Sequence, residues 1–366
     1  MTPATDSLQE SAEVGTDNLL LKCIRITGGE SVLLILEPEA ETVYDHEAWK
    51  IIQDRIKNVG CSVEVMRPNL ITDPKDFPES VATAMQQHDH TLFLSRIGDY
   101  SRFTPLPGIG SKTLCYARTA EMLASPFAAI CHQLMSTLLE KLENELMAAE
   151  IWRINCDLGT DIQGTFCWPS QQHLIDDEFS LGLFPVTTFK PVPCDTAHGQ
   201  VALSRWLVPG AAAKLKPSTL SFDDLVNVEV QQGTIKGIRG PKQSVQRIAD
   251  FYDFVSQQLR VTRDRVHSWH AGINPFTYYR GDVDTELEKW GAISFASPRY
   301  LHFHTCGDVP PGEIAWSVFN PTVQVDGETF WEDGQFTWLQ RKDNLEILAG
   351  SKDGETLLQA SQDIGT

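Results

Sequence analysis

The sequence predicts an α/β N-terminal domain, with a parallel sheet and flanking helices, over residues 18–150, and a β-rich, mainly antiparallel C-terminal domain over 151–343. Three observations predict this fold class. Short apolar runs alternate with helical patterns before residue 150, as in parallel α/β folds. Alternating or aromatic-rich runs broken by Gly, Pro and Asp-Gly turns follow it, as in antiparallel sheets. The apolar content of 42% in a chain of 366 residues can fill a substantial core.

In the first part, strands and helices are expected in alternation. The buried strands are expected at SVLLILEP (31–38), CSVEVMRP (61–68) and HTLFLSRI (90–97). Helices are expected over 45–60, where Gly60 is a plausible stop, in the later part of 73–87, and over the long stretch 125–150.

In the second part, the β-runs are interrupted by one amphipathic helix, expected over 244–260. The expected antiparallel segments are 150–169, 199–210, 226–240, 292–307 and 321–341. The first eighteen residues and the polar tail after about 343 are expected to be weakly ordered.

Charge and cysteine usage limit the class of protein. Lys and Arg total 30 against 49 Asp and Glu, a formal charge of −19, which repels phosphate backbones and anionic lipids. Nucleic acid and membrane partners are therefore not expected. The N-terminus lacks the features of a secretory signal, so we expect a cytoplasmic protein. The eight cysteines are scattered without a CxxC pair, which is typical of reduced, buried thiols.

Two segments resemble functional motifs but are better explained otherwise. In PLPGIGSKT (105–113), Ser111 separates Gly110 from Lys112, so the spacing of a phosphate-binding P-loop is not met and a turn before a strand is expected. The acidic loop SQQHLIDDEFS (170–180) is expected to be a solvated connection.

The stretch YLHFHTCG contains two histidines one residue apart. In a strand, His302 and His304 would project from the same face, where two imidazoles could bind one cation. The alternation also permits a plain alternative. Both imidazoles would then face solvent, while Leu301, Phe303 and Thr305 face the core.

Two further features favour a metal site. Glu313 follows a turn after His304, so antiparallel strands joined there would bring its carboxylate near the two imidazoles. HAGINP (270–275) places His270 before a loop stiffened by Gly and Pro, with His267 as an alternative one helical turn earlier. Histidines with one carboxylate and open positions suit catalytic Fe(II), Zn or Mn.

Four segments in order resemble the M29-type aminopeptidase superfamily and, within it, the 2,5-dihydroxypyridine dioxygenases. The segments are LGTDIQG (158–164), FPVTTFKPVP (184–193), HAGINP (270–275) and PGEIAWSVFNPTVQVDGETFWEDGQF (311–336). The resemblance covers about 150–340 well and the N-terminal part loosely. It implies a metalloenzyme scaffold that commonly forms homo-oligomers, and for the dioxygenases a non-haem iron that serves ring opening.

Residue by residue, the resemblance implies an altered metal site. The place of the peptidase carboxylate falls at Thr187 or Thr188, and a His-x-Asp pair of the relatives is replaced by Glu313 and Ala315. The two-metal peptidase site therefore looks dismantled, because neutral side chains cannot balance two dications. A single-metal site is the remaining expectation. Its ligands would be His270, His302, His304 and Glu313.

The leading hypothesis is a mononuclear non-haem Fe(II) oxygenase that acts on a small aromatic, heteroaromatic or amino-acid-derived metabolite, with Zn or Mn as alternative metals. Trp269 would contact the substrate, Arg280 or Arg299 would pair with an anionic group, and Tyr278 would donate a proton. One alternative is a metal-dependent hydrolase or cyclase with Glu313 as base. Another is a non-catalytic relative that uses its cleft for binding.

Overall fold

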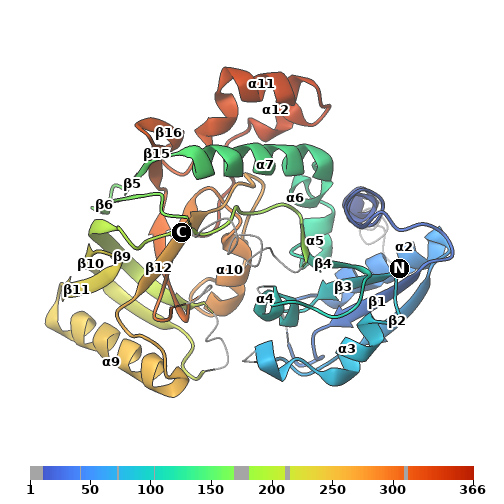
Figure 1. The fold of residues 1–366 in the computed structure, drawn as a ribbon, viewed down its shortest axis with the longest axis horizontal. Coiled ribbons are helices and arrows are strands. Elements are labelled where there is room, and N and C mark those ends of the chain that lie inside the picture. The colour runs from blue at the N-terminus through green and yellow to red at the C-terminus, as the bar shows by residue number, and fades with distance from the viewer. Residues whose placement is uncertain are drawn as a thin grey trace. The chain divides into compact units, whose positions relative to one another are not determined.

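The computed structural model describes residues 11–41, 43–71, 74–102, 104–168, 181–210, 215–308 and 312–366 (Figure 1). The acidic loop predicted at 170–180 lies outside the described residues. The chain divides into two compact units, Met1–Thr137 with Gln171–Val186, and Leu138–Ser170 with Thr187–Thr366. In the part of the chain that the structure describes, no helix is both long and apolar enough to cross a membrane.

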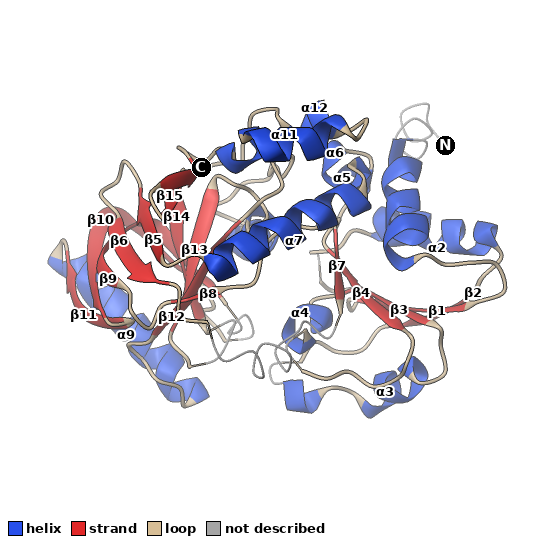
Figure 2. Ribbon diagram, turned by 45° about the horizontal axis from the view of Figure 1, so that its top comes forward, coloured by secondary structure: helices blue, strands red, loops and turns tan. Residues whose placement is uncertain are grey.

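The first unit is built on a five-stranded sheet in the order β2-β1-β3-β4-β7, in which every neighbouring pair is parallel. Figure 2 shows α2 and α3 on opposite faces of this sheet. The strands are β1 (Ser31–Leu36), β2 (Ser62–Met66), β3 (His90–Leu94), β4 (Ser111–Cys115) and β7 (Gly182–Phe184). The predicted α/β class of the N-terminal part is confirmed. β7 comes from the range 151–343 but pairs with β4 in this sheet.

The long helix α2 of the first unit begins and ends at capping residues. In α2 (His46–Val59), the Asp45 side chain accepts from the backbone N–H of Ala48 at 2.6 Å, and Gly60 ends the helix with a φ of 93°. Further helices of this unit are η1 (Asn18–Ile24), η2 (Pro74–Asp76), α3 (Glu79–Met85), α4 (Ile97–Ser101), α5 (Ala120–Leu123) and α6 (Pro126–Ala129). The helix α7 (His132–Ala148) begins in the first unit and continues in the second.

The helical stretch predicted over 125–150 is confirmed over most of its length, but it is interrupted between α6 and α7. The buried amide of Asn18 explains the break. Its nitrogen donates to the carbonyls of Ala128 and Ile130 at 2.7 and 2.6 Å, and its oxygen accepts from the N–H of His132 at 3.0 Å. Asn18 thus satisfies backbone groups that a helix interruption leaves unpaired.

The turn expected at 105–113 is confirmed. Residues 107–110 form bends that lead into β4, and the ammonium of Lys112 donates to the carbonyls of Gly108 and Gly110 at 2.6 and 3.1 Å. The lysine therefore closes its own turn. This contact gives Lys112 a structural role in the turn.

The second unit contains a large curled sheet in which every described pair is antiparallel, which confirms the predicted β-rich class. The order is β16-β15-β5-β6-β9-β14-β13-β12-β8, and β10 joins β9 to β11. The strands are β5 (Ile151–Asn155), β6 (Asp161–Thr165), β8 (Val192–Pro193), β9 (His198–Pro209), β10 (Leu220–Gln231), β11 (Thr234–Arg239), β12 (Val266–Ala271), β13 (Tyr300–Thr305), β14 (Ile314–Phe319), β15 (Thr322–Val325) and β16 (Glu328–Trp331).

The helix predicted over 244–260 is confirmed as α9 (Lys242–Leu259), which packs on β10 (Figure 1). The β-run predicted over 292–307 is confirmed in its later part, which contains β13 (Tyr300–Thr305), but not at its start. Its first residues belong to α10 (Leu287–Ser294), because Trp290 and Ile293 form a buried helical face before β13 begins at Tyr300.

The tail after residue 343 is folded, contrary to the expectation of weak order. It forms α11 (Lys342–Ala349) and α12 (Gly354–Leu357), after the short η4 (Thr337–Gln340). The indole nitrogen of Trp290 donates to the carbonyl of Ile364 at 2.7 Å, and the Ile364 side chain is buried. The tail therefore completes the core of the second unit.

The packing of α12 predicts unequal effects at two adjacent leucines. Leu357 is 2% exposed and Leu358 is 38% exposed. We expect Leu357→Ala to lower the free energy of unfolding by about 2–4 kcal/mol, because it leaves a cavity, and Leu358→Ala to change it by about 0.5 kcal/mol or less. Denaturant unfolding of both variants measures this difference. Equal effects would contradict a docked tail.

Candidate metal centre

Two neighbouring strands of the second unit place four polar side chains on one face. In the antiparallel register of β12 and β13, Ser268 lies opposite His304 and His270 lies opposite His302. Directly opposed residues point to the same side of a sheet, and residues two apart on one strand do so as well. The four side chains therefore share one face.

Three of these side chains form a compact cluster of imidazoles. His270, His302 and His304 are all buried and offer ligand atoms that lie within 4.8 Å of one another. The Nε2 atoms of His270 and His302 are 2.5 Å apart. Among the described residues, these three form the group of His, Cys, Asp or Glu side chains whose ligand atoms converge in this way. Each ring offers a lone pair that could bind the same cation.

The contacts of the other ring nitrogens orient the cluster. The Nδ1 atom of His270 lies 3.4 Å from the carbonyl oxygen of Phe189, and the Nδ1 atom of His304 lies 3.1 Å from the hydroxyl oxygen of Ser268. Metal-binding histidines usually donate their second nitrogen to such partners, which fixes the tautomer. Both rings are thereby left with Nε2 as the ligand atom.

The loop after His270 is held tightly, as the glycine in HAGINP predicts. A Cβ atom on Gly272 would lie 2.1 Å from the backbone carbon of Ala296, so only glycine fits there. The N–H of Ile273 donates to the carbonyl of Thr187 at 2.9 Å, and the N–H of Asn274 donates to that of Ala296 at 3.0 Å. These bonds fix the backbone next to His270.

The structure also separates the alternatives that the sequence leaves open. His267 is not part of the cluster, because the pairing of β12 shifts between Val266 and Ser268, and its Nδ1 atom contacts the Ser268 hydroxyl at 2.8 Å. The plain alternative for β13 is wrong. His302 and His304 are only 7% and 2% exposed, so they do not face solvent.

Glu313 is not brought into the cluster of ligand atoms. It comes one residue before β14, and Ala315, two residues later, lies opposite His304. Its backbone N–H donates to the carbonyls of Thr305 and Cys306 at 3.0 and 2.9 Å. Burial raises the pKa of the Glu313 carboxyl from 4.5 to about 7. A carboxyl with this pKa can exchange a proton near neutrality.

The place of the missing peptidase carboxylate is filled by neutral side chains. Thr188 bridges to Gly272, just after His270, and both Thr187 and Thr188 are buried. Among the described residues, the two threonine hydroxyls therefore lie beside β12, the strand that carries His270. The resemblance implies a carboxylate at this place.

Trp269 does not face the cluster. It alternates with Ser268 and His270, so its ring points to the opposite side of β12, where it packs edge-on against Trp152 and Phe189 at 5.7 Å from each. Its indole is fully buried. These are contacts of a core residue, and we leave Trp269 out of the proposed site.

The structure does not join the other predicted substrate residues to the imidazoles. Arg280 is exposed, and its guanidinium stacks over the ring of Tyr278 at 4.7 Å. Arg299 donates to the Asn320 side chain at 2.9 Å and pairs with Asp363 at 3.7 Å. The roles predicted for Tyr278, Arg280 and Arg299 therefore stay predictions.

Two neighbours of the cluster were not found from the sequence. The Ser268 hydroxyl contacts two imidazoles, and the ring of Tyr300 stacks on His302 with centroids 5.3 Å apart and an angle of 14°. Tyr300 does stand two residues before His302, which is a signal for a shared face on a strand. Ser268 could be assigned only once the register of β12 and β13 was known.

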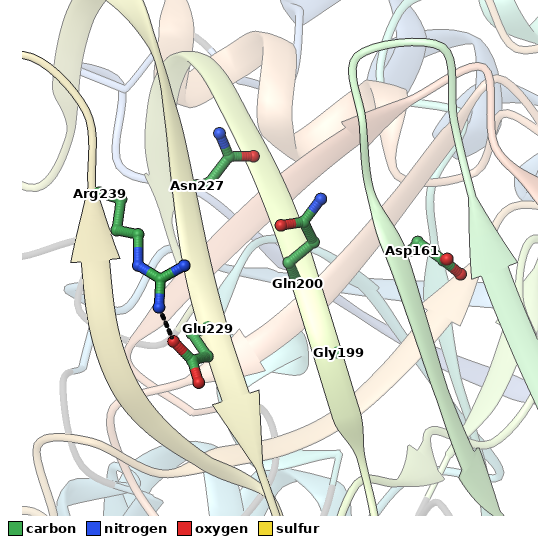
Figure 3. A pocket seen from close by; sticks show the side chains of 6 residues that line it. All are labelled: Asp161, Gly199, Gln200, Asn227, Glu229 and Arg239. Atoms are coloured by element: carbon green, nitrogen blue, oxygen red, sulfur yellow. Dashed lines mark hydrogen bonds and ion pairs between the residues drawn. The ribbon is translucent and has the colours of Figure 1, made fainter.

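A polar hollow of about 330 Å³ lies elsewhere in the second unit, on the face formed by β6, β9, β10 and β11 (Figure 3). Its acids already have partners. Glu229 pairs with Arg239, and Asp161 accepts from the side chain of Arg153 at 2.9 Å. This hollow has no histidine and is not a candidate for the metal chemistry.

The geometry predicts which variants lose a metal ion. After anaerobic loading with Fe(II), we expect His270→Ala, His302→Ala and His304→Ala to retain little iron, because each removes a converging ligand, while His267→Ala retains it. We expect Ser268→Ala to weaken binding by about 10- to 100-fold, since it frees the His304 ring. Metal counting on the purified proteins measures this. Iron retained by all three cluster variants would refute the site.

Comparison with known proteins gives information about the fold. No protein-family model and no curated protein matches the chain. Solved structures with a similar fold include 2,5-dihydroxypyridine dioxygenase from Pseudomonas putida KT2440, with a TM-score of 0.59, and wild-type AmpT from Thermus thermophilus, with a TM-score of 0.52. Each is 12% identical, and each comparison covers 91% of this chain and 99% of the other. The chain shares the fold of both structures.

Proposed function

We propose that the chain is a mononuclear non-haem Fe(II) oxygenase that acts on a small aromatic, heteroaromatic or amino-acid-derived metabolite. The observation that carries this proposal is the group of three buried imidazoles on β12 and β13, with ligand atoms within 4.8 Å. Three protein ligands on one side of an ion leave other positions open for substrate and O2. Closed structural sites use four ligands instead.

The chain's own residues fit such an ion. His270 and His304 are oriented by the Phe189 carbonyl and the Ser268 hydroxyl, so their Nε2 atoms are positioned before an ion binds. The cluster is buried, which excludes bulk water from the ligands. A bound Fe(II) ion would supply the oxygen chemistry, while the protein orients the substrate.

The neutral ligand set has a consequence for the substrate. Imidazoles bind a dication without cancelling its charge, and the described ligand atoms of the cluster include no carboxylate. A buried centre that keeps two positive charges favours an anionic guest. We therefore propose a substrate that binds through an ionised oxygen, such as a phenolate or a carboxylate.

A metal-dependent hydrolase or cyclase is the second candidate, and Glu313 favours it. Three histidines are also a ligand set of catalytic zinc, which activates water. Burial raises the pKa of Glu313 to about 7, which suits a general base. In this candidate Glu313 moves a proton and does not bind the ion. Mn is a further alternative for either candidate.

Oxygen consumption tests the leading proposal. Protein loaded with Fe(II) should consume O2 above the rate of free Fe(II) when it is offered hydroxypyridines, catechols or aromatic amino acids, and His302→Ala should not. An oxygen electrode with product analysis measures this. Turnover of ester or amide substrates by zinc-loaded protein, with no O2 uptake by the iron form, would reject the oxygenase in favour of the hydrolase.

The pH dependence of the free energy of unfolding tests whether the Glu313 carboxyl is buried. A carboxyl whose pKa is raised by folding opposes folding once it ionises, so its cost begins above the unfolded pKa near 4.5 and is complete above about 7. We expect Glu313→Gln to remove this cost. Relative to wild type, its free energy of unfolding should rise by up to about 3 kcal/mol between about pH 4 and pH 8. Parallel pH profiles of the two proteins would contradict this.

A further inference from the structure

The parallel sheet of the first unit has a switch point between β1 and β3. The chain goes from β1 to β2 on one side, and then returns to add β3 and β4 on the other side of β1. In open α/β sheets, ligands bind at the carboxyl ends of the strands at such a point. Glu37 directly follows β1, Arg96 follows β3 by two residues, and Arg118 follows β4 by three.

These three residues belong to a buried network of charges. Oε1 of Glu37 accepts from the Nε of Arg96 at 2.7 Å and from its backbone N–H at 3.1 Å. The Nη2 of Arg118 donates to Asp99 at 3.2 Å. Glu37 and Arg118 are only 4% and 1% exposed. Charged groups at such depth are stable only when their hydrogen-bonding atoms find partners.

Among the residues that the structure describes, three atoms of the network have no such partner. They are Oε2 of Glu37, and Nε and Nη1 of Arg118. One is an acceptor and two are donors. Glu37 follows β1 and Arg118 follows β4, and both strands are neighbours of β3 in the sheet. The negative charge of Glu37 also raises the pKa of the Arg118 guanidinium. Leaving the three atoms unpaired would cost about 1–3 kcal/mol for each group, or more for a charge, so a partner from outside the chain fits here.

The Arg118 guanidinium is held in place before any ligand arrives. It lies over the rings of Tyr44 and Tyr116, 5.1 and 5.5 Å from their centroids. The Tyr116 hydroxyl donates to Asp99 at 3.0 Å, and the Tyr44 hydroxyl donates to the Cys115 carbonyl at 2.7 Å. Burial lowers the pKa of Arg118, but the surrounding tyrosines and acids outweigh it and the pKa is raised. The guanidinium is thus a fixed cation.

We infer that this edge of the sheet binds a small zwitterion of the amino-acid type, with its carboxylate on Arg118 and its ammonium group on Glu37. The charges favour a zwitterion over a simple anion. Arg96 and Arg118 already have acidic partners in Glu37, Glu41 and Asp99, so an added anion alone would be uncompensated. A zwitterion adds no net charge and supplies both the acceptor and the donor that the site lacks.

Calorimetric titration of the full-length chain tests this inference. The probes are the protein amino acids, with acetate, methylammonium and inorganic phosphate as partial mimics. We expect at least one amino acid to bind and to raise the melting temperature, as a ligand specific for the folded state must. Binding of none of the amino acids would overturn the inference. If acetate or phosphate binds as tightly as the best amino acid, the proposal that the ligand is a zwitterion is wrong.

Variants locate the binding and have matched controls in the same unit. Arg118→Lys and Glu37→Gln should each weaken the amino acid roughly tenfold or more, which is about 1.4 kcal/mol. Arg55→Lys on α2 and Glu64→Gln on β2 carry the same substitutions at side chains that are 33% and 54% exposed, and they should leave binding unchanged. Binding that survives both site variants would place the ligand elsewhere.

A wild-type experiment covers the case in which the site variants do not fold. Crystals of the wild-type protein soaked with the best-binding amino acid should show it between Arg118 and Glu37. Ordered water alone at these atoms would overturn the inference. All of the residues involved belong to the first unit. Either result therefore leaves the metal proposal to be judged by its own tests.

Discussion

The register between β12 and β13 is the constraint on which the candidate metal centre depends. It sets His270 directly opposite His302 and Ser268 opposite His304, and such opposed pairs bring Cβ atoms to about 5 Å from one another. A slip by one residue would turn the β13 imidazoles to the other face and dissolve the cluster. The register is secured because β13 is a central strand that pairs with both β12 and β14 and is buried along its whole length.

The sequence predicts what is local in this arrangement and misses what depends on register. The spacing of His302 and His304 predicts a shared face, because the two-residue period of a strand is a local property. It does not say which of His267 and His270 comes opposite them, since a shift in the pairing of β12 decides that. Glu313 was expected among the ligands because the sequence does not show the register of β13 and β14. The position of Glu313 relative to these ligands follows from where β14 begins and from the register of β13 and β14.

The same distinction between local and long-range information applies to the prediction of the fold. Hydrophobic periodicity and capping residues predicted the α/β class, the antiparallel class, α2 and α9. Two of the differences between prediction and structure come from long-range contacts. Asn18 breaks the 125–150 stretch through bonds to residues more than a hundred positions away, and the polar tail folds because it finds a buried partner in Trp290. Such contacts override local propensity and leave no local signal.

The tail and the candidate metal centre are linked by contiguous packing within the second unit. The carbonyl of Ile364 fixes the indole of Trp290, whose ring lies 5.1 Å from that of Tyr300, and Tyr300 stacks on His302. Each member is buried, so none can change its position without disturbing the next. A ligand imidazole held by stacking on one side and by an opposed histidine on the other has little freedom to reorient. A cation bound by these imidazoles alone would depend on ligands that are already in place when it binds, and this rigid support would hold them there.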